Sequence, residues 1–166
     1  HNCAMYRKNM FVSMATYIKK RQSTFAQSII KTIKQINDNS HIILYLDSTQ
    51  SKIIKKEIEK NTKMTIKLLK GNVNIINSYI ENFENGEINI LVVDKLMMDY
   101  GIDLKHAKHL IISTTQNIDI INRIIGKCQR IGRTCPLNIQ FIDNISNDFD
   151  ISSLDYEFTN IIQRTI

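Results

Sequence analysis

Cations and glycines are crowded into residues 123–133, whose sequence is RIIGKCQRIGR. Upstream, the tripeptide Gly101-Ile102-Asp103 adds a carboxylate next to another glycine. Fixed cations beside a carboxylate suit a ligand with several negative charges, most simply the ribose and phosphates of a nucleotide. The cations are Arg123, Lys127, Arg130 and Arg133, and the glycines among them are Gly126 and Gly132.

The elements around these residues are predicted to bring them together. Residues 90–93 (ILVV) and 110–112 (LII) are short, wholly apolar runs, as expected of strands buried on both faces. Gly101 lies where the chain leaving the first strand must turn, and glycine adopts backbone angles that other residues resist. Loops beyond the carboxyl ends of parallel strands form the ligand crevice of such sheets. A helix is predicted after the second strand from one apolar face, made of Ile118, Ile121, Ile124 and Ile125.

Strands and helices alternate along the rest of the chain. Further strands are expected at residues 42–46, 64–69 and 137–142, the second nearer a sheet edge because polar residues interrupt it. Helices are expected from a Ser23 cap to residue 36, from a Ser48 cap to about Lys60, and over residues 73–83. This alternation predicts an α/β fold, a three-layer parallel sheet with helices on both faces. The inward helical residues are expected to be Phe25, Ile29, Ile30, Ile33 and Ile36, then Ile53, Ile54 and Ile58, then Ile75, Ile76, Tyr79, Ile80 and Phe83.

From about residue 25 to 143, the chain resembles the C-terminal (second) RecA-like domain of superfamily 2 helicases, a branch of the P-loop NTPases. Motif V of that family ends in Gly-(Ile/Leu)-(Asp/Asn), which matches residues 101–103. Motif VI is Gln/His-x-x-Gly-Arg-x-x-Arg; residues 123–130 match it, with Arg123 for the Gln/His and Lys127 for the first arginine. A second register, residues 129–133, matches the letters better. We prefer the first register because its distance from Gly101 is nearer to the spacing in the family. The strand at 137–142 then also follows as the expected closing strand.

The resemblance implies roles for these residues. Arg130 would be the arginine finger that reaches the γ-phosphate of ATP bound on a partner domain, with Lys127 assisting as the second catalytic cation. Asp103 would bind the ribose or anchor the cations. Gly101, Gly126 and Arg133 would lie on the nucleotide side; in the second register Arg133 would itself be the finger.

Nucleic-acid contacts are also implied. A strand, a polar loop and a helix at residues 42–60 have the layout of motif IV, whose loop faces the nucleic-acid backbone, where helix N–H groups bind phosphate. That loop is Asp47, Ser48 and Thr49, which could equally be a simple cap and turn. Asp94 and Lys95, at the end of the motif V strand, would face the same DNA or RNA.

The sequence lacks two parts of an ATPase. It contains no G-x-x-x-x-G-K-[ST] phosphate loop and no Asp-Glu pair after a strand to hold magnesium. We therefore expect that this chain alone does not hydrolyse ATP. ATP and Mg²⁺ would be bound mainly by a preceding RecA-like ATPase domain of the same protein.

Composition is that of a globular chain, with 43% hydrophobic and 23% charged residues in 166. Residues 141–166 hold five acids and one base, which leaves 21 bases against 11 acids, or +10, over residues 1–140. A phosphate-rich partner or a solvated lysine-rich surface would explain this balance. We expect three parts: a basic lead-in or linker (1–22), the RecA-like domain (23–143), and an acidic helical tail (144–166) that packs back or meets a protein partner.

Cysteine usage and hydropathy bear on location. Three cysteines without repeated spacing favour a reducing, intracellular compartment, the cytoplasm or nucleus. No apolar run is long enough to cross a bilayer, and His106, His109, Cys128 and Cys135 lack the paired spacing of a metal site. The wealth of Ile, Asn and Lys indicates an AT-rich genome, such as that of a large DNA virus or a parasite.

Two other classes remain open. One is a flavodoxin-like module that binds a nucleotide or a phosphorylated partner without motor action. The other is a structural domain of a transcription or replication assembly that has lost its activity.

Overall fold

Six parallel strands form a single sheet in the computed structural model, in the order β2-β3-β1-β4-β5-β6. The structure describes residues 24–36, 41–112, 118–142 and the strand 159–165. The lead-in 1–22, the Ser23 cap and residues 113–117 lie outside that description. The strands are β1 (Ile42–Tyr45), β2 (Ile66–Leu68), β3 (Ile90–Val93), β4 (His109–Ile112), β5 (Leu137–Ile142) and β6 (Thr159–Thr165).

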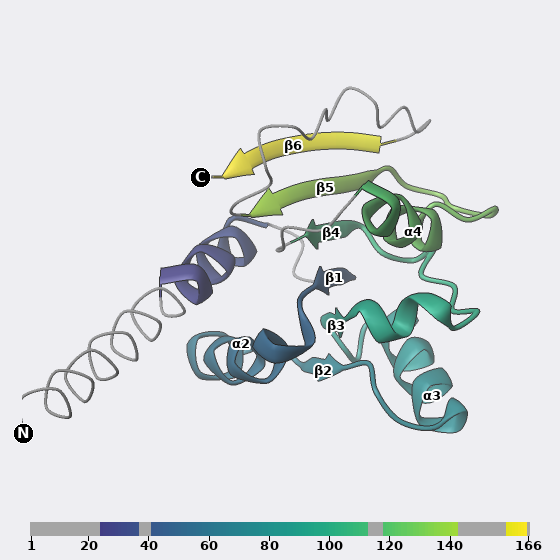
Figure 1. Cartoon of the computed structure of the whole chain (residues 1–166), viewed down its shortest axis with the longest axis horizontal. Helices are drawn as coiled ribbons and strands as arrows, with labels where there is room; N and C mark the ends of the chain where they lie inside the picture. The colour runs from purple at the N-terminus through teal and green to yellow at the C-terminus, as the bar shows by residue number, and fades with distance from the viewer. Residues whose placement is uncertain (1–23, 37–40, 113–117, 143–158, 166) are drawn as a thin grey trace, which may run out of the picture.

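Helices cover both faces of the sheet, which confirms the predicted three layers (Figure 1). On one face, the helix at residues 24–35 and α2 (Ser48–Asn61) cover one set of alternating strand side chains. On the other, α3 (Val73–Glu84), the short 3₁₀ helix η1 (Lys95–Asp99) and α4 (Ile118–Cys128) cover the other set. Two apolar cores therefore hold the sheet between them.

The central strands owe their place to their sequences. β1 and β3 are wholly apolar and buried at every residue, because both of their faces are covered by helices. β2 lies at the sheet edge, as predicted; there Ile66 is buried and Lys67 is exposed. The 3₁₀ helix after β3 was not foreseen.

Two predicted core residues and one predicted cap were wrong. Ile53 and Ile75 are 43% and 41% exposed, because each lies beside the buried stripe of its helix; the buried neighbours are Ile54 and Ile76. Asp47, not Ser48, is the N-cap of α2, and its side chain makes no capping hydrogen bond.

The predicted helical tail is also wrong over its last part. Residues 159–165 form β6, which pairs in parallel with β5 and has a register shift between Ile139 and Gln140. The pairing gives the backbone groups of β5 partners on that side, which an isolated amphipathic helix could not provide. The acidic residues 143–158 lie outside the described part. Among the described helices, none is long and apolar enough to cross a membrane.

The packing of α3 gives a first testable prediction. Phe83 is 1% exposed, and its ring meets the His41 ring edge-on, with centroids 5.3 Å apart. We expect Phe83→Ala to lower the free energy of unfolding by about 3–5 kcal/mol, because it leaves a cavity in the core. Val73→Ala, at the exposed end of the same helix, should change it by about 0.5 kcal/mol or less. Urea unfolding measures both; equal effects would contradict the described packing.

Candidate functional site

The loops after β1 and β3 meet at the carboxyl edge of the sheet. Tyr45, the last residue of β1, pairs with Val93, the last residue of β3. Burial, together with the nearby carboxylates of Asp94 and Asp47, raises the pKa of Tyr45 to about 12. The two predicted nucleic-acid loops therefore lie side by side, as a parallel sheet requires.

The first residues after β3 divide into a buried anchor and an exposed cation. Asp94 is 7% exposed, and its Oδ1 accepts a hydrogen bond from the backbone N–H of Leu96 at 3.0 Å, which caps η1. Lys95 is exposed. The structure thus gives Asp94 a local structural task and leaves Lys95 facing solvent.

Gly101 does not use the conformational freedom expected of it. Its φ lies outside the left-handed region, and an added Cβ would meet nothing within 4 Å. The expectation that this turn needs a glycine was therefore wrong. Asp103, two residues on, closes a small turn: its Oδ1 accepts from the N–H of Lys105 at 2.9 Å, while its carboxylate stays half exposed.

The residues that were predicted to form motifs V and VI are in direct contact. The backbone N–H of Leu104 donates to the carbonyl of Lys127 at 2.9 Å. The Lys127 ammonium donates to the carbonyl of Tyr100 at 2.6 Å, next to Gly101. These contacts bring the segment around Gly101 next to the carboxyl end of α4, as the sequence predicted.

Arg123 and Lys127 are both tethered. Arg123 reaches across to Asp99 of η1, with an N–O distance of 3.2 Å between exposed side chains. Lys127 is 8% exposed; burial lowers its pKa, and the positive charges of Arg130 and Arg123 lower it further, partly offset by Asp99.

Arg133 is committed to backbone carbonyls. Its guanidinium donates to the carbonyls of Lys105, Ala107, Cys128 and Cys135 at 2.8–3.1 Å. Reaching a phosphate with this guanidinium would break these bonds.

Arg130 differs from the other cations. It is exposed, just beyond α4, and within the described residues its side chain makes no hydrogen bond or ion pair. Gly126, on the helix before it, has nothing within 4 Å of an added Cβ. Arg130 is therefore the cation of this group whose side chain has no hydrogen bond or ion pair among the described residues.

The loop expected to act as motif IV is open to solvent. Asp47, Ser48 and Thr49 are all exposed at the start of α2. The Asp47 carbonyl accepts from the N–H groups of Gln50 and Ser51. The Asp47 side chain makes no capping hydrogen bond to the first turn of α2.

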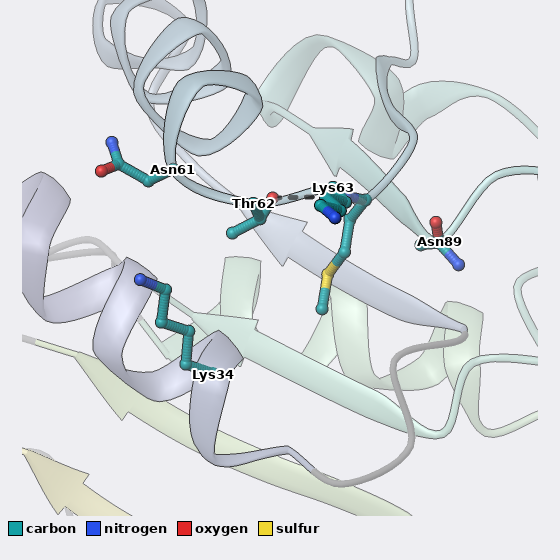
Figure 2. Close-up of a pocket in the computed structure, with 6 residues that line it drawn as sticks. Lys34, Asn61, Thr62, Lys63 and Asn89 are labelled. Atoms are coloured by element: carbon teal, nitrogen blue, oxygen red, sulfur yellow. Dashed lines mark hydrogen bonds between the residues drawn. The ribbon is translucent and has the colours of Figure 1, made fainter.

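A groove of about 390 Å³ lies elsewhere, at the amino ends of β2 and β3 (Figure 2). Figure 2 shows Lys34 extending toward Asn61. Two polar side chains in this groove are hydrogen-bonded to the backbone. Thr62 Oγ1 donates to the carbonyl of Ile58 at 2.8 Å, and Asn89 Oδ1 accepts from the N–H of Thr65 at 2.8 Å. In the described part of the chain, no three His, Cys, Asp or Glu residues are grouped to hold a metal ion.

The sequence of this chain is similar to that of a viral protein described as a helicase. The chain matches no protein-family model. It is 26% identical over 158 residues to "Putative helicase R592" of Acanthamoeba polyphaga mimivirus, covering 94% of the chain and 18% of that protein. The chain thus spans less than a fifth of this viral relative.

Solved structures share the fold. The C-terminal part of the Fun30 ATPase domain superposes with a TM-score of 0.61 at 21% identity, over 69% of this chain and 39% of that one. The C-terminal domain of the DEAD-box protein Dbp5 gives 0.58 at 14% identity, over 74% and 71%.

The buried Lys127 gives a prediction about pH. A lysine whose pKa is lowered in the folded state binds fewer protons there than when unfolded, so its unfavourable contribution shrinks as pH rises toward 10.5. We expect the free energy of unfolding of the wild type to rise relative to Lys127→Met between pH 7 and 10.5. The gain is at most about 1.4 kcal/mol for each unit by which the pKa is lowered. The exposed Lys60→Met should show no such trend; a constant difference for Lys127→Met would contradict the assignment.

The parallel sheet agrees with the solved structures on the fold, and the sequence is similar to that of a putative viral helicase. This chain has the three-layer α/β fold of the RecA-like C-terminal domains of an ATPase and a DEAD-box protein, and its sequence is similar to that of a putative helicase.

Proposed function

We propose that this domain is the second half of an ATP-dependent DNA or RNA helicase or translocase, and that it supplies Arg130 to ATP held on a preceding RecA-like domain. The observation that carries the proposal is the contrast among the four cations. Arg123, Lys127 and Arg133 each have partners within the domain, whereas the Arg130 side chain has none among the described residues.

The arrangement suits charge delivery. An arginine supplied across a domain interface stabilises the charge that develops on a transferring phosphoryl group. Such stabilisation is strongest when the donor is aimed before the reaction, so that it costs no reorganisation. Lys127 adds positive charge beneath Arg130, and Asp103 offers a half-exposed carboxylate for a ribose hydroxyl or a neighbouring cation.

ATP and Mg²⁺ fit this division of labour. Bound ATP would supply the phosphoanhydride to be cleaved, with Mg²⁺ neutralising its phosphates. The open space over Gly126 and Gly101 leaves room for a nucleotide or the opposing domain to approach the cations.

Nucleic acid would lie across the carboxyl edge of the sheet. Lys95 follows β3, and the exposed loop of Asp47, Ser48 and Thr49 follows the neighbouring strand β1, so both lie at this edge. The first turn of α2 offers N–H groups to a phosphate. The charge of +10 over residues 1–140 favours such a partner. A protein partner is also compatible, since a Dbp5 C-terminal domain has been solved bound to Gle1 and IP6. An intracellular, reducing location belongs to the same proposal.

The test is substitution of Arg130 in the full-length protein. We expect Arg130→Ala to lower the nucleic-acid-stimulated kcat for ATP hydrolysis by about 10³-fold or more, because the lost charge acts mainly in the transition state. Lys60→Ala, an exposed change on α2, should leave kcat unchanged. If Arg130→Ala turns over ATP like the wild type, the domain is a binding module or a structural domain.

Gly126 provides a second prediction, in which stability and activity move in opposite directions. It lies inside α4 with room for a Cβ, so Gly126→Ala should raise the free energy of unfolding by about 0.5–1 kcal/mol. If the opposing domain or nucleotide approaches there, the same change should lower ATPase activity. Gly132→Ala, at φ +91°, should instead destabilise the chain. A stabilised Gly126→Ala protein with full activity would contradict close approach at this helix.

A further inference from the structure

The Arg133 side chain connects three separate segments of backbone. Its Nη1 donates to Ala107 O at 2.8 Å, Lys105 O at 3.0 Å and Cys128 O at 3.1 Å, and its Nε donates to Cys135 O at 3.0 Å. These carbonyls belong to the loop after Asp103, the last residue of α4, and the loop leading to β5.

The guanidinium meets these acceptors with two different nitrogens: Nη1 faces three of the carbonyls, which share its two hydrogens, and Nε faces the fourth. The Cys128 carbonyl is among those that a helix leaves unpaired at its carboxyl end. Arginine presents five N–H donors in a rigid planar fork, whereas a lysine ammonium is a single nitrogen on a flexible stem. The contacts therefore depend on the shape of the side chain as well as on its charge.

A turn joins this side chain to Arg130. The backbone N–H of Arg133 donates to the carbonyl of Arg130 at 3.4 Å, and Gly132 between them has φ +91°. These four residues form a β-turn, with Arg130 at the first position and Arg133 at the fourth. Gly132 occupies the third position, which requires positive φ in a type II turn. Because the turn joins the two residues, the contacts that hold Arg133 also restrain the backbone of Arg130.

We propose that Arg133 is a positioning residue: it holds the turn of Arg130 against the loop of motif V, so that Arg130 is aimed before any nucleotide binds. This inference rests on the proposed function of Arg130. It differs from a nucleotide-binding role for Arg133, because the guanidinium acts through the backbone and through Arg130.

The test combines Arg133→Lys and Arg133→Gln with Arg130→Ala in the full-length protein. A displacement of about 1 Å in a catalytic group can cost up to about 100-fold in rate, so we expect both Arg133 variants to lose about 10-fold or more in kcat with little change in KM for ATP. Because Arg133 acts through Arg130, neither change should lower kcat further in the Arg130→Ala background. Amide hydrogen exchange should quicken in peptides covering residues 104–108 and 126–135. The control, Lys60→Gln, should alter neither measurement.

Three results would overturn the proposal. They are full activity in Arg133→Lys, an equal loss of kcat in the presence and absence of Arg130, and unchanged hydrogen exchange at residues 104–108. If Arg130→Ala itself retains wild-type turnover, the proposed function fails. Hydrogen exchange in the two Arg133 variants then decides whether Arg133 holds these segments together.

Discussion

The loop after β3 and the carboxyl end of α4 are joined through backbone carbonyls, and the geometry of the site depends on that joining. The carbonyls of Tyr100 and Cys128 accept hydrogen bonds from the side chains of Lys127 and Arg133. A buried carbonyl such as that of Cys128 costs about 1–3 kcal/mol when it is left without a donor. The donors to these carbonyls are the cationic side chains of Lys127 and Arg133. The same hydrogen bonds therefore satisfy the backbone and bring positive charges together.

Gathering like charges is unfavourable, and the domain offsets most of the cost locally. Asp99 pairs with Arg123, while carbonyl dipoles face Lys127 and Arg133. Some repulsion remains, because the charges of Arg130 and Arg123 help to lower the pKa of Lys127. An anion arriving at Arg130 would relieve this repulsion, which gives a phosphate a favourable term beyond its direct contact with the guanidinium.

Sequence patterns predicted the sheet better than they predicted its additions. Residues 90–93 form β3 with the predicted bounds, because a short β-branched run covered on both faces has no competing helical pattern. Over residues 159–165 the spacing of Ile161 and Ile162 with upstream apolar residues suggested a helix, yet the segment pairs with β5. Local periodicity carries no information about an open sheet edge that a distant segment can extend.

The site was predicted in outline and not in its mechanics. Motif spacing placed Gly101 near residues 123–133, and the contact of Lys127 with the Tyr100 carbonyl bears this out. The task of Arg133 could not be read from sequence, because its partners are main-chain carbonyls whose residue types carry no signal. The open space around Gly101 was equally hidden, since a glycine in sequence does not reveal whether φ or clearance is at issue.

The lysine at position 127, where the family pattern has arginine, has a physical explanation. Its ammonium is buried and meets one described acceptor, the Tyr100 carbonyl. A planar guanidinium there would bring five donors into a place that offers few acceptors, and its unpaired N–H groups would cost more than a single ammonium does. Lysine also keeps its charge compact and close to the carbonyl. Lysine at position 127 is therefore compatible with the proposed charge delivery by Arg130, because Lys127 tethers the loop while the Arg130 side chain stays exposed.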